Sequence, residues 1–185
     1  MKTGEVVCRF AAKNGFDVTL RTPQWSDLDG LLSLINSLVR EGAEISRDAE
    51  ISRDAELDWL AKMLVSVERD EVFFLVAEVS GKIVASTSFR ARGGYAAHIA
   101  DLGIVVKKGY RDIGIGFAIM TTLATQARKQ GLKMLVLTAF ASNKRAIHVY
   151  EKSGFKEVGR LPKAFLKDNR YIDQIQMAKV LGESQ

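Results

Sequence analysis

Two short stretches of the sequence combine residue types that could bind an anion and donate a proton. The first is Arg-Asp-Ile-Gly-Ile-Gly at residues 111–116, which joins an apolar stretch to a helix-forming one and has Lys107 and Lys108 beside it. Glycines let a ligand approach the backbone closely, and the unpaired N–H groups of a helix N-terminus attract anions. This stretch favours a phosphate-bearing ligand, although the same glycines could instead allow tight packing of a helix on a strand.

Two familiar phosphate-binding motifs do not fit this stretch. Gly109 and Gly114 have the spacing of a P-loop, but Ile115 stands where the phosphate-binding lysine is required. A dinucleotide fingerprint needs a third glycine where Ile119 stands, and it needs an acid at the end of the next strand, where residues 133–137 offer none. The remaining interpretation is a pyrophosphate held by backbone N–H groups at the start of a helix.

The second stretch, residues 143–155, pairs a polar amide with a phenol. Seven positions separate Asn143 from Tyr150, which is two turns of helix, so both side chains leave the same face about 10.5 Å apart. A tyrosine with an ordinary pKa of about 10 is protonated at neutral pH, and it can donate its proton to a basic leaving group. A tyrosine that only packs against its neighbours is the alternative.

Together, Arg-x-x-Gly-x-Gly and, 32 residues after its arginine, Asn-x-x-Ala-x-x-x-Tyr-x-x-x-Gly-Phe resemble the two motifs of the GNAT superfamily of acetyl-CoA-dependent N-acetyltransferases. The resemblance covers nearly the whole chain. It implies transfer of an acetyl group from acetyl-CoA to a primary amine by direct attack on the thioester, with the acceptor a small amine, a polyamine, an amino acid, or a protein N-terminus or lysine. The alternative function is a coenzyme A-binding or sensor module that does not turn over.

The resemblance also implies roles for particular residues. Tyr150 would protonate the coenzyme A thiolate, and Asn143 would contact the cofactor. Backbone groups at Ile104, Val105 and Val106 would meet the pantetheine arm and the acetyl carbonyl where two parallel strands splay apart. The residues expected to hold the pyrophosphate are Arg111, Asp112, Ile113, Gly114, Ile115, Gly116 and Phe117. Neither a metal ion nor a covalent intermediate at Cys8 is required.

The base that deprotonates the acceptor is the least defined part of the expected site. Family members that act on ribosomal protein N-termini carry a glutamate five places before the asparagine, where this chain has Thr138. Other members use an acid on the strand before the glycine turn, which makes Asp101 a candidate and His98 its rival. Three residues apart on a strand, these two side chains face opposite sides, so at most one is expected in the site.

Hydropathy patterns predict the element order β-β-α-α-β-β-β-α-β-α-β-β. A hairpin spans residues 6–21 around a two-residue Asn14-Gly15 turn. A capping box of Ser26 and Asp29 precedes a helix to about residue 40, and a second helix covers 57–67. The glycine turn opens a third helix that closes at Gly131, a fourth covers 144–153, and the last strands are 155–160 and 171–180. The predicted fold is a mixed α/β (α+β) domain of GNAT type over residues 1–185, with a central, mostly antiparallel sheet that contains a parallel splayed pair and about four flanking helices.

Composition indicates where the protein is located and which partners it binds. A single cysteine excludes an intramolecular disulfide and favours a reducing, cytoplasmic location. No apolar run approaches membrane-spanning length, so no membrane partner is expected. A net charge of +5 favours an anionic ligand, but the basic residues Lys163, Lys167 and Arg170 lack an aromatic platform, so nucleic acid is not expected. An edge strand near the C-terminus could form a homodimer.

An internal repeat lies between the first two predicted helices. Residues 43–48, Ala-Glu-Ile-Ser-Arg-Asp, recur identically at 49–54, and Ala55-Glu56 begins a third copy. It can be interpreted as a tolerated insertion in a surface connection. Alternatively, five acids against two arginines from residue 44 to 56 form an acidic lip that attracts an amine.

Overall fold

The structure is a computed structural model that describes residues 2–182. The contacts within the chain group its residues into two compact units. The first contains residues 2–90 and 104–116, and the second contains residues 91–103 and 117–182. The expectation of one domain over residues 1–185 stays a prediction.

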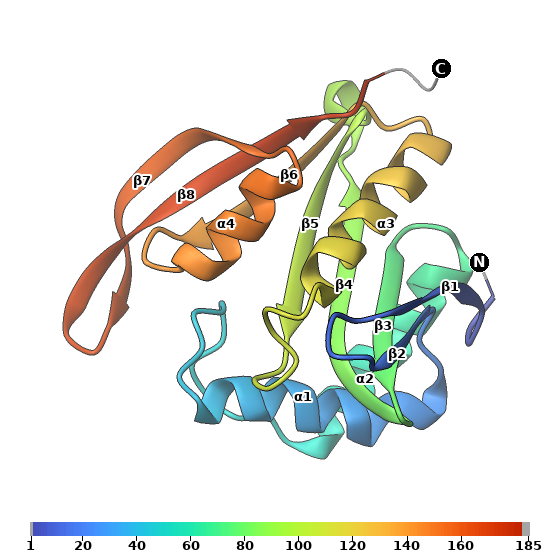
Figure 1. Ribbon diagram of the computed structural model, residues 1–185. Helices are drawn as coiled ribbons and strands as arrows, with labels where there is room; N and C mark the ends of the chain where they lie inside the picture. The colour runs from blue at the N-terminus through green and yellow to red at the C-terminus, as the bar shows by residue number, and fades with distance from the viewer. Residues whose placement is uncertain (1, 183–185) are drawn as a thin grey trace. The chain divides into compact units, whose positions relative to one another are not determined.

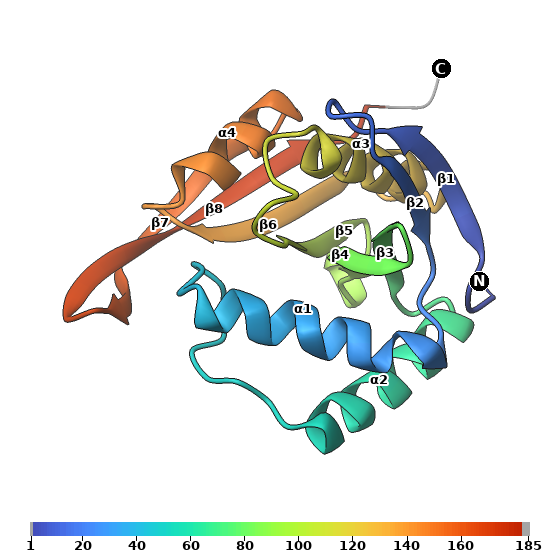
Figure 2. The same ribbon diagram turned by 60° about the horizontal axis from the view of Figure 1, so that its bottom comes forward.

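The first unit is an antiparallel sheet covered by two helices. Its strands are paired in the order β1-β2-β3-β4. The elements are β1 (Val6–Ala11), β2 (Asp17–Arg21), the short 3-10 helix η1 (Trp25–Asp27), α1 (Leu28–Arg40), α2 (Arg53–Glu68), β3 (Phe73–Val79) and β4 (Lys82–Ala91). The helices α1 and α2 lie side by side on one face of these strands (Figures 1 and 2).

Leucines at helical spacing hold the two helices against the sheet. Leu31, Leu34 and Leu38 of α1 recur every three or four residues, so they line one face of the helix, and all three are buried. Leu60 and Leu64 of α2 do the same and join one core cluster with Val72, Phe74, Val76 and Ile83. Each buried leucine stabilises the fold by roughly 1.5 to 3 kcal/mol of transfer free energy.

The N-terminal hairpin has a different turn from the predicted one. The N–H of Gly15 donates to Ala12 O at 2.9 Å, and the N–H of Ala12 donates to Phe16 O at 2.8 Å, so three residues form the loop. Gly15 has a φ of +84°. A tight turn followed by a left-handed residue is the usual three-residue hairpin, so the two-residue turn at Asn14-Gly15 was wrong.

The predicted capping box of Ser26 and Asp29 was also wrong. The box forms two residues earlier, at η1, where Gln24 and Asp27 bond reciprocally. Asp27 is 4% exposed and also accepts two hydrogen bonds from Arg21, at 2.6 and 2.7 Å. Arg21 bonds Glu78 of β3 as well, and these bonds raise the pKa of the guanidinium against the opposing effect of its burial. Burial of Arg21 selects Asp27 for the box, since each buried charge needs a partner.

The two copies of the repeat take different conformations. In the first copy, Ile45 packs against the core cluster. In the second, both backbone groups of Ile51 bond to the side chain of Asn36 at 3.0 Å, and Ser52 accepts the N–H of Ala55 as the N-cap of α2. Because a serine cap satisfies a free N–H group, α2 begins at Arg53, four residues before the predicted start.

Charges within the repeat are partly paired. Glu50 bonds Arg40 at 2.8 Å, and Arg53 bonds Asp29 at 2.8 Å. Glu56 is buried, and its burial raises the pKa of the carboxyl although Arg47 opposes the shift. Arg40 thus compensates one acid of the repeat, while Asp29 engages one of its two arginines, so these two exposed pairs leave the acidic excess predicted from the sequence unchanged.

The second unit continues the chain with a parallel strand pair. Its elements are η2 (Gly94–Ala96), β5 (Ile99–Val106, whose last three residues belong to the first unit), α3 (Ile115–Lys129, which begins in the first unit), β6 (Met134–Phe140), α4 (Lys144–Lys152), β7 (Lys156–Lys167) and β8 (Arg170–Val180). The strand order is β5-β6-β8-β7, and α4 lies across β6 and β8 (Figures 1 and 2).

The pairing of β5 with β6 is parallel, and it is short. The paired residues are Ile99 with Met134, Ala100 with Leu135, and Asp101 with Val136. Within the second unit, β5 continues to Gly103 and β6 to Phe140 beyond this ladder. These pairings and the element order confirm the predicted mixed, mostly antiparallel fold with a parallel splayed pair. None of the helices in residues 2–182 is long and apolar enough to cross a membrane.

The strand predicted at residues 155–160 extends to Lys167. Two irregularities interrupt its pairing with β8, between Glu157 and Gly159 and between Leu161 and Phe165. The turn to β8 is Asp168-Asn169, and both residues have positive φ, as a two-residue hairpin turn requires. Such bulges break the alternation of apolar and polar residues, so the sequence pattern ended too early.

We expect the buried ion pair at η1 to matter far more for stability than an exposed one. Asp27→Ala leaves the guanidinium of Arg21 buried with only Glu78 as an acidic partner, and should lower the free energy of unfolding by about 3 kcal/mol. Asp29→Ala removes the partner of the exposed Arg53 and should cost less than about 1 kcal/mol. Urea unfolding of both variants measures the difference. Equal losses would contradict this account of Arg21.

Candidate functional site

The glycine turn of the sequence forms a fixed loop between β5 and α3. The N–H of Lys107 donates to Val84 O of β4 at 2.8 Å, and the N–H of Tyr110 donates to Lys107 O at 3.1 Å. Gly109, Asp112 and Gly114 have positive φ values of +88°, +64° and +94°. Glycine adopts this region freely and aspartate tolerates it, so these residues allow the chain to turn directly into α3.

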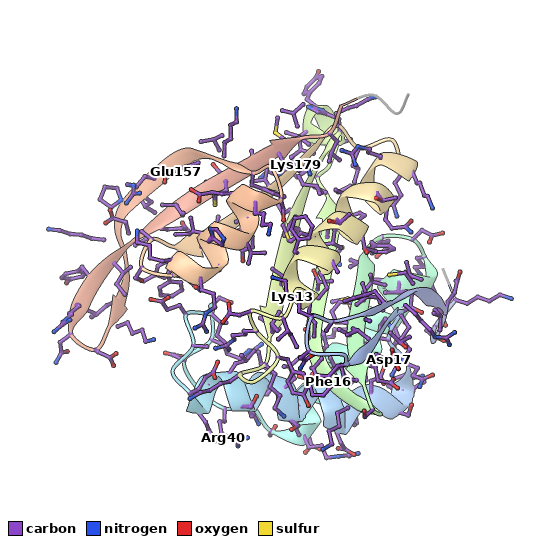
Figure 3. The ribbon with its side chains drawn as sticks, in the orientation of Figure 1. Lys13, Phe16, Asp17, Arg40, Glu157 and Lys179 are labelled. Atoms are coloured by element: carbon purple, nitrogen blue, oxygen red, sulfur yellow. The ribbon has the colours of Figure 1, made fainter. Side chains whose placement is uncertain are left out.

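The hairpin turn between β1 and β2 is bonded to this loop. The N–H of Lys13 donates to Ile113 O at 2.9 Å, and the rings of Phe16 and Tyr110 lie 6.0 Å apart. A Cβ on Gly114 would have the Cγ of Lys13 as its only neighbour, at 3.8 Å. The space beside Gly114 is therefore open and bordered by the basic side chain of Lys13, which Figure 3 labels at the turn between β1 and β2. Sequence analysis missed Lys13 because it lies 101 positions from Gly114.

Arg111 is bonded within the first unit. Its Nε donates to Val106 O at 2.8 Å, and its Nη2 donates to the carboxylate of Glu41, just after α1. The side chains of Arg111 and Glu41 are only 23% and 14% exposed. An anion at this loop would therefore meet backbone N–H groups and nearby lysines, while the guanidinium of Arg111 is already engaged. Glu41 is a second residue that sequence analysis missed, because nothing local marks a contact across 70 positions.

The other residues expected around the cofactor differ in how deeply they are buried. Val105 packs against the core cluster of the first unit, and Ile115 is fully buried. Ile104, Ile113 and Gly116 are half-buried, and Asp112 is exposed. In the second unit, the ring of Phe117 is 41% exposed, with Nζ of Lys152 5.5 Å from its centre. The buried members of the set position the backbone, since their side chains face the core.

The α4 helix carries Asn143 and Tyr150. Asn143 is the N-cap, and its Oδ1 accepts the N–H of Ala146 at 3.2 Å, which leaves its Nδ2 group outside the cap. Tyr150 is 8% exposed, its ring centre lies 6.4 Å from that of Phe155, and burial raises the pKa of its phenol to about 12. The phenol is therefore a proton donor over the whole neutral range.

Both candidate bases lie in the second unit, and both are exposed. Asp101 accepts two hydrogen bonds from Arg92, at 2.6 and 2.8 Å. His98 immediately precedes β5, and its backbone oxygen accepts the N–H groups of Lys133 and Met134. The N–H of Arg92 also bonds Ile99 O, which places Arg92 beside the start of β5.

Comparison with known proteins places these features in a family. The model of the acetyltransferase (GNAT) family matches residues 33–155. The L-amino acid N-acetyltransferase of Escherichia coli is 30% identical over 118 residues, which are 61% of this chain and 71% of that protein. An L-methionine sulfoximine/L-methionine sulfone acetyltransferase of Salmonella typhimurium is 24% identical over 170 residues, covering 90% of this chain and 96% of the relative.

Solved structures share the fold. A phosphinothricin acetyltransferase of Sinorhizobium meliloti, crystallised with acetyl-CoA, superposes with a TM-score of 0.77 at 20% identity, and the match covers 89% of each chain. This likeness agrees with the strand order and with the parallel pair described above.

The contact between Glu41 and Arg111 should stabilise the 107–114 loop. A charge-assisted hydrogen bond to a half-buried group stabilises by about 1.5 kcal/mol, so Glu41→Gln should speed amide hydrogen exchange at Lys107 and Tyr110 about tenfold. Asp58→Asn, at an exposed position of α2, is the control and should leave both amides unchanged. If exchange at the loop is the same in both variants, Glu41 does not hold the loop.

Proposed function

As a member of the acetyltransferase (GNAT) family, the chain is an acetyltransferase, and we propose that it moves the acetyl group of acetyl-CoA to the primary amine of an amino acid. The observation that carries this proposal is the family match over residues 33–155, which spans both the glycine turn and Tyr150. Two relatives named for amino acids or their analogues support the class of acceptor.

The residues of the 107–114 loop fit a pyrophosphate. Backbone N–H groups at the start of α3 are free of helical partners, and the helix dipole adds positive potential there. Gly114 leaves open space, while Lys13, Lys107 and Lys108 supply charge from the hairpin and the loop. We propose that this loop binds the pyrophosphate mainly through its backbone, with the Glu41 contact of Arg111 holding the loop in shape.

Acetyl transfer requires one bond to form and one to break. The amine nitrogen forms a bond to the acetyl carbon and then loses a proton to water, the bond from that carbon to sulfur breaks, and sulfur leaves as a thiolate. We assign Tyr150 as the proton donor to this thiolate, because its raised pKa keeps the phenol protonated. Backbone N–H groups at Ile104, Val105 and Val106 would stabilise the negative oxygen that develops on the carbonyl.

The attacking amine must first lose a proton. Asp101 is exposed, and both of its carboxylate oxygens already accept hydrogen bonds from Arg92. His98 is exposed as well. We propose that water takes the proton, in contact with one of these two side chains.

A coenzyme A-binding module without turnover is the second candidate function. The engagement of Asp101 by Arg92 favours it, because no buried, unpaired base stands on β5 in the described structure. Steady-state turnover with any amine would exclude this candidate. A cytoplasmic location and a homodimer stay predictions of the sequence.

Replacing the phenol tests the proton donor. Tyr150→Phe keeps the packing against Phe155 but removes the hydroxyl, so kcat should fall by about 10- to 100-fold while the Kd for acetyl-CoA changes little. Tyr171→Phe, at a position 66% exposed, is the matched control and should retain full kcat. The measurements are release of free thiol and calorimetry. An unchanged kcat in Tyr150→Phe would remove Tyr150 from this role.

Three substitutions at one position test the pyrophosphate cradle. Gly114 has positive φ, so Gly114→Ala measures backbone strain alone, Gly114→Gln adds bulk, and Gly114→Glu adds negative charge of nearly the same shape. Affinity for acetyl-CoA should fall in that order, with the Glu variant at least about tenfold weaker than the Gln variant. Calorimetry on the folded variants gives each Kd. Equal affinity of the Gln and Glu variants would place the pyrophosphate elsewhere.

A further inference from the structure

A depression of about 360 Å³ opens on the second unit, away from the residues assigned above. It lies over β6, β8 and β7, and its lining residues are Thr138, Gly159, Arg160, Leu161, Gln174 and Gln176. None of them belongs to the glycine turn or to α4. The depression therefore needs an explanation of its own.

Strand register explains which side chains line it. Thr138 of β6 stands opposite Gln176 of β8, and Gln176 stands opposite Gly159 of β7. Gln174 lies two positions from Gln176 and so projects from the same face of β8. Gly159 has no side chain, and a Cβ there would lie 3.6 Å from Oε1 of Gln176. The hollow exists because a glycine stands beside two glutamines.

The side chains that face the hollow carry no charge. Arg160 lies between Gly159 and Leu161 and opposite Ile175, so its side chain leaves the other face of β7. There its guanidinium bonds Glu157 and Asp173. Hydrogen bonds from the N–H of Lys163 and from the guanidinium of Arg160 lower the pKa of Asp173. Arg160 thus lines the depression through its backbone, and its charge is satisfied elsewhere.

The lining residues determine which chemical class of ligand group the hollow can bind. A glutamine amide offers both donors and an acceptor, and a threonine hydroxyl offers one donor and an acceptor. A charged group in the hollow would lose water without meeting an opposite charge. A purely apolar group would displace water from the glutamine amides and leave their hydrogen bonds to water unreplaced. An uncharged group that both donates and accepts hydrogen bonds, above all a carboxamide, satisfies the lining.

The hollow begins where the parallel pair ends. The ladder between β5 and β6 stops at Asp101 and Val136, and Thr138 follows two residues later on the same face as Val136. The proposed function places the acetyl carbonyl where these strands separate. We propose, on the basis of that function, that Thr138, Gln174 and Gln176 bind the uncharged, hydrogen-bonding side chain of the acceptor amino acid, with glutamine as the best-fitting type.

An acceptor series tests the preference. Wild-type enzyme should show a kcat/KM for glutamine at least about tenfold above those for leucine, glutamate and lysine, since two neutral hydrogen bonds contribute about that factor. Gln174→Leu/Gln176→Leu should reduce the ratio of glutamine to leucine about tenfold and leave the Kd for acetyl-CoA unchanged. Gln130→Leu, at the exposed position just after α3, is the matched control and should keep the wild-type ratio.

Filling the hollow gives two further measurements. One is the KM for glutamine, and the other is a shift in Tm that does not depend on turnover. Gly159→Leu should raise the KM for glutamine at least about tenfold, whereas Gly159→Ala, whose Cβ meets only ordinary contacts, should raise it little. N-acetylglutamine should raise the Tm of the wild type above its value with coenzyme A alone, and this additional shift should be lost in Gly159→Leu.

The outcomes separate this inference from the proposed function. Absence of transfer to every amine, with acetyl-CoA still bound, would overturn the proposed function and the inference that rests on it. Transfer at equal kcat/KM for glutamine, leucine, glutamate and lysine would leave the function intact and overturn the side-chain site alone. A glutamine preference that persists in the double glutamine variant would also overturn the site.

Discussion

Parallel pairing of β5 with β6 requires the chain to cross back between the two strands. This requirement determines where α3 lies and where it begins. Two parallel strands cannot be joined by a tight turn, so a helix must carry the chain from the end of β5 to the start of β6. The start of α3 then lies at the carboxyl end of β5, where its N–H groups are unpaired. The crossover thus places a helix end, whose N–H groups we propose bind the pyrophosphate, directly after the strand that the resemblance assigns to the pantetheine arm.

Charged residues that suggest ligands in the sequence are largely bonded to one another in the structure. Arg111 bonds Glu41, Asp101 bonds Arg92, and Arg160 bonds Asp173. In the first two cases the group that sequence reasoning offers to a ligand is held by a protein partner, and in the third the charge beside the hollow is held in the same way. The chemistry proposed for the chain accordingly relies on backbone N–H groups, a buried phenol and neutral amides. Such groups bind without the large cost of removing a free charge from water.

Most elements were predictable because their apolar residues recur with a clear period. The leucines of α1 and the alternation in β3 and β4 mark those elements without reference to the rest of the chain. Predictions failed where a distant residue decides the local geometry. Asp27 forms the capping box because it is needed by Arg21, and β7 continues past its bulges because β8 pairs with it.

The candidate site likewise contains residues that could be predicted from the sequence and residues that could not. Tyr150 and Asn143 could be placed on one helix from their spacing, and the glycine turn could be placed before a helix. Lys13 and Glu41 could not be found, since each reaches the 107–114 loop across a long stretch of chain. The side-chain hollow was equally hidden, because it depends on the register of three strands that the sequence leaves open.

The repeat between α1 and α2 allows the chain to change length without disturbing either helix. Removing any six consecutive residues within 43–56 yields one and the same protein, in which the last copy still supplies the serine that begins α2. The connection of twelve residues, 41–52, would become six, a halving that alters closure entropy by only about 0.6 kcal/mol. A single isoleucine would then have to replace both Ile45 in the core and Ile51 at Asn36. A change in the number of repeats in the gene would therefore shorten or lengthen this connection in steps of six residues. The serine that begins α2 would be kept at every step.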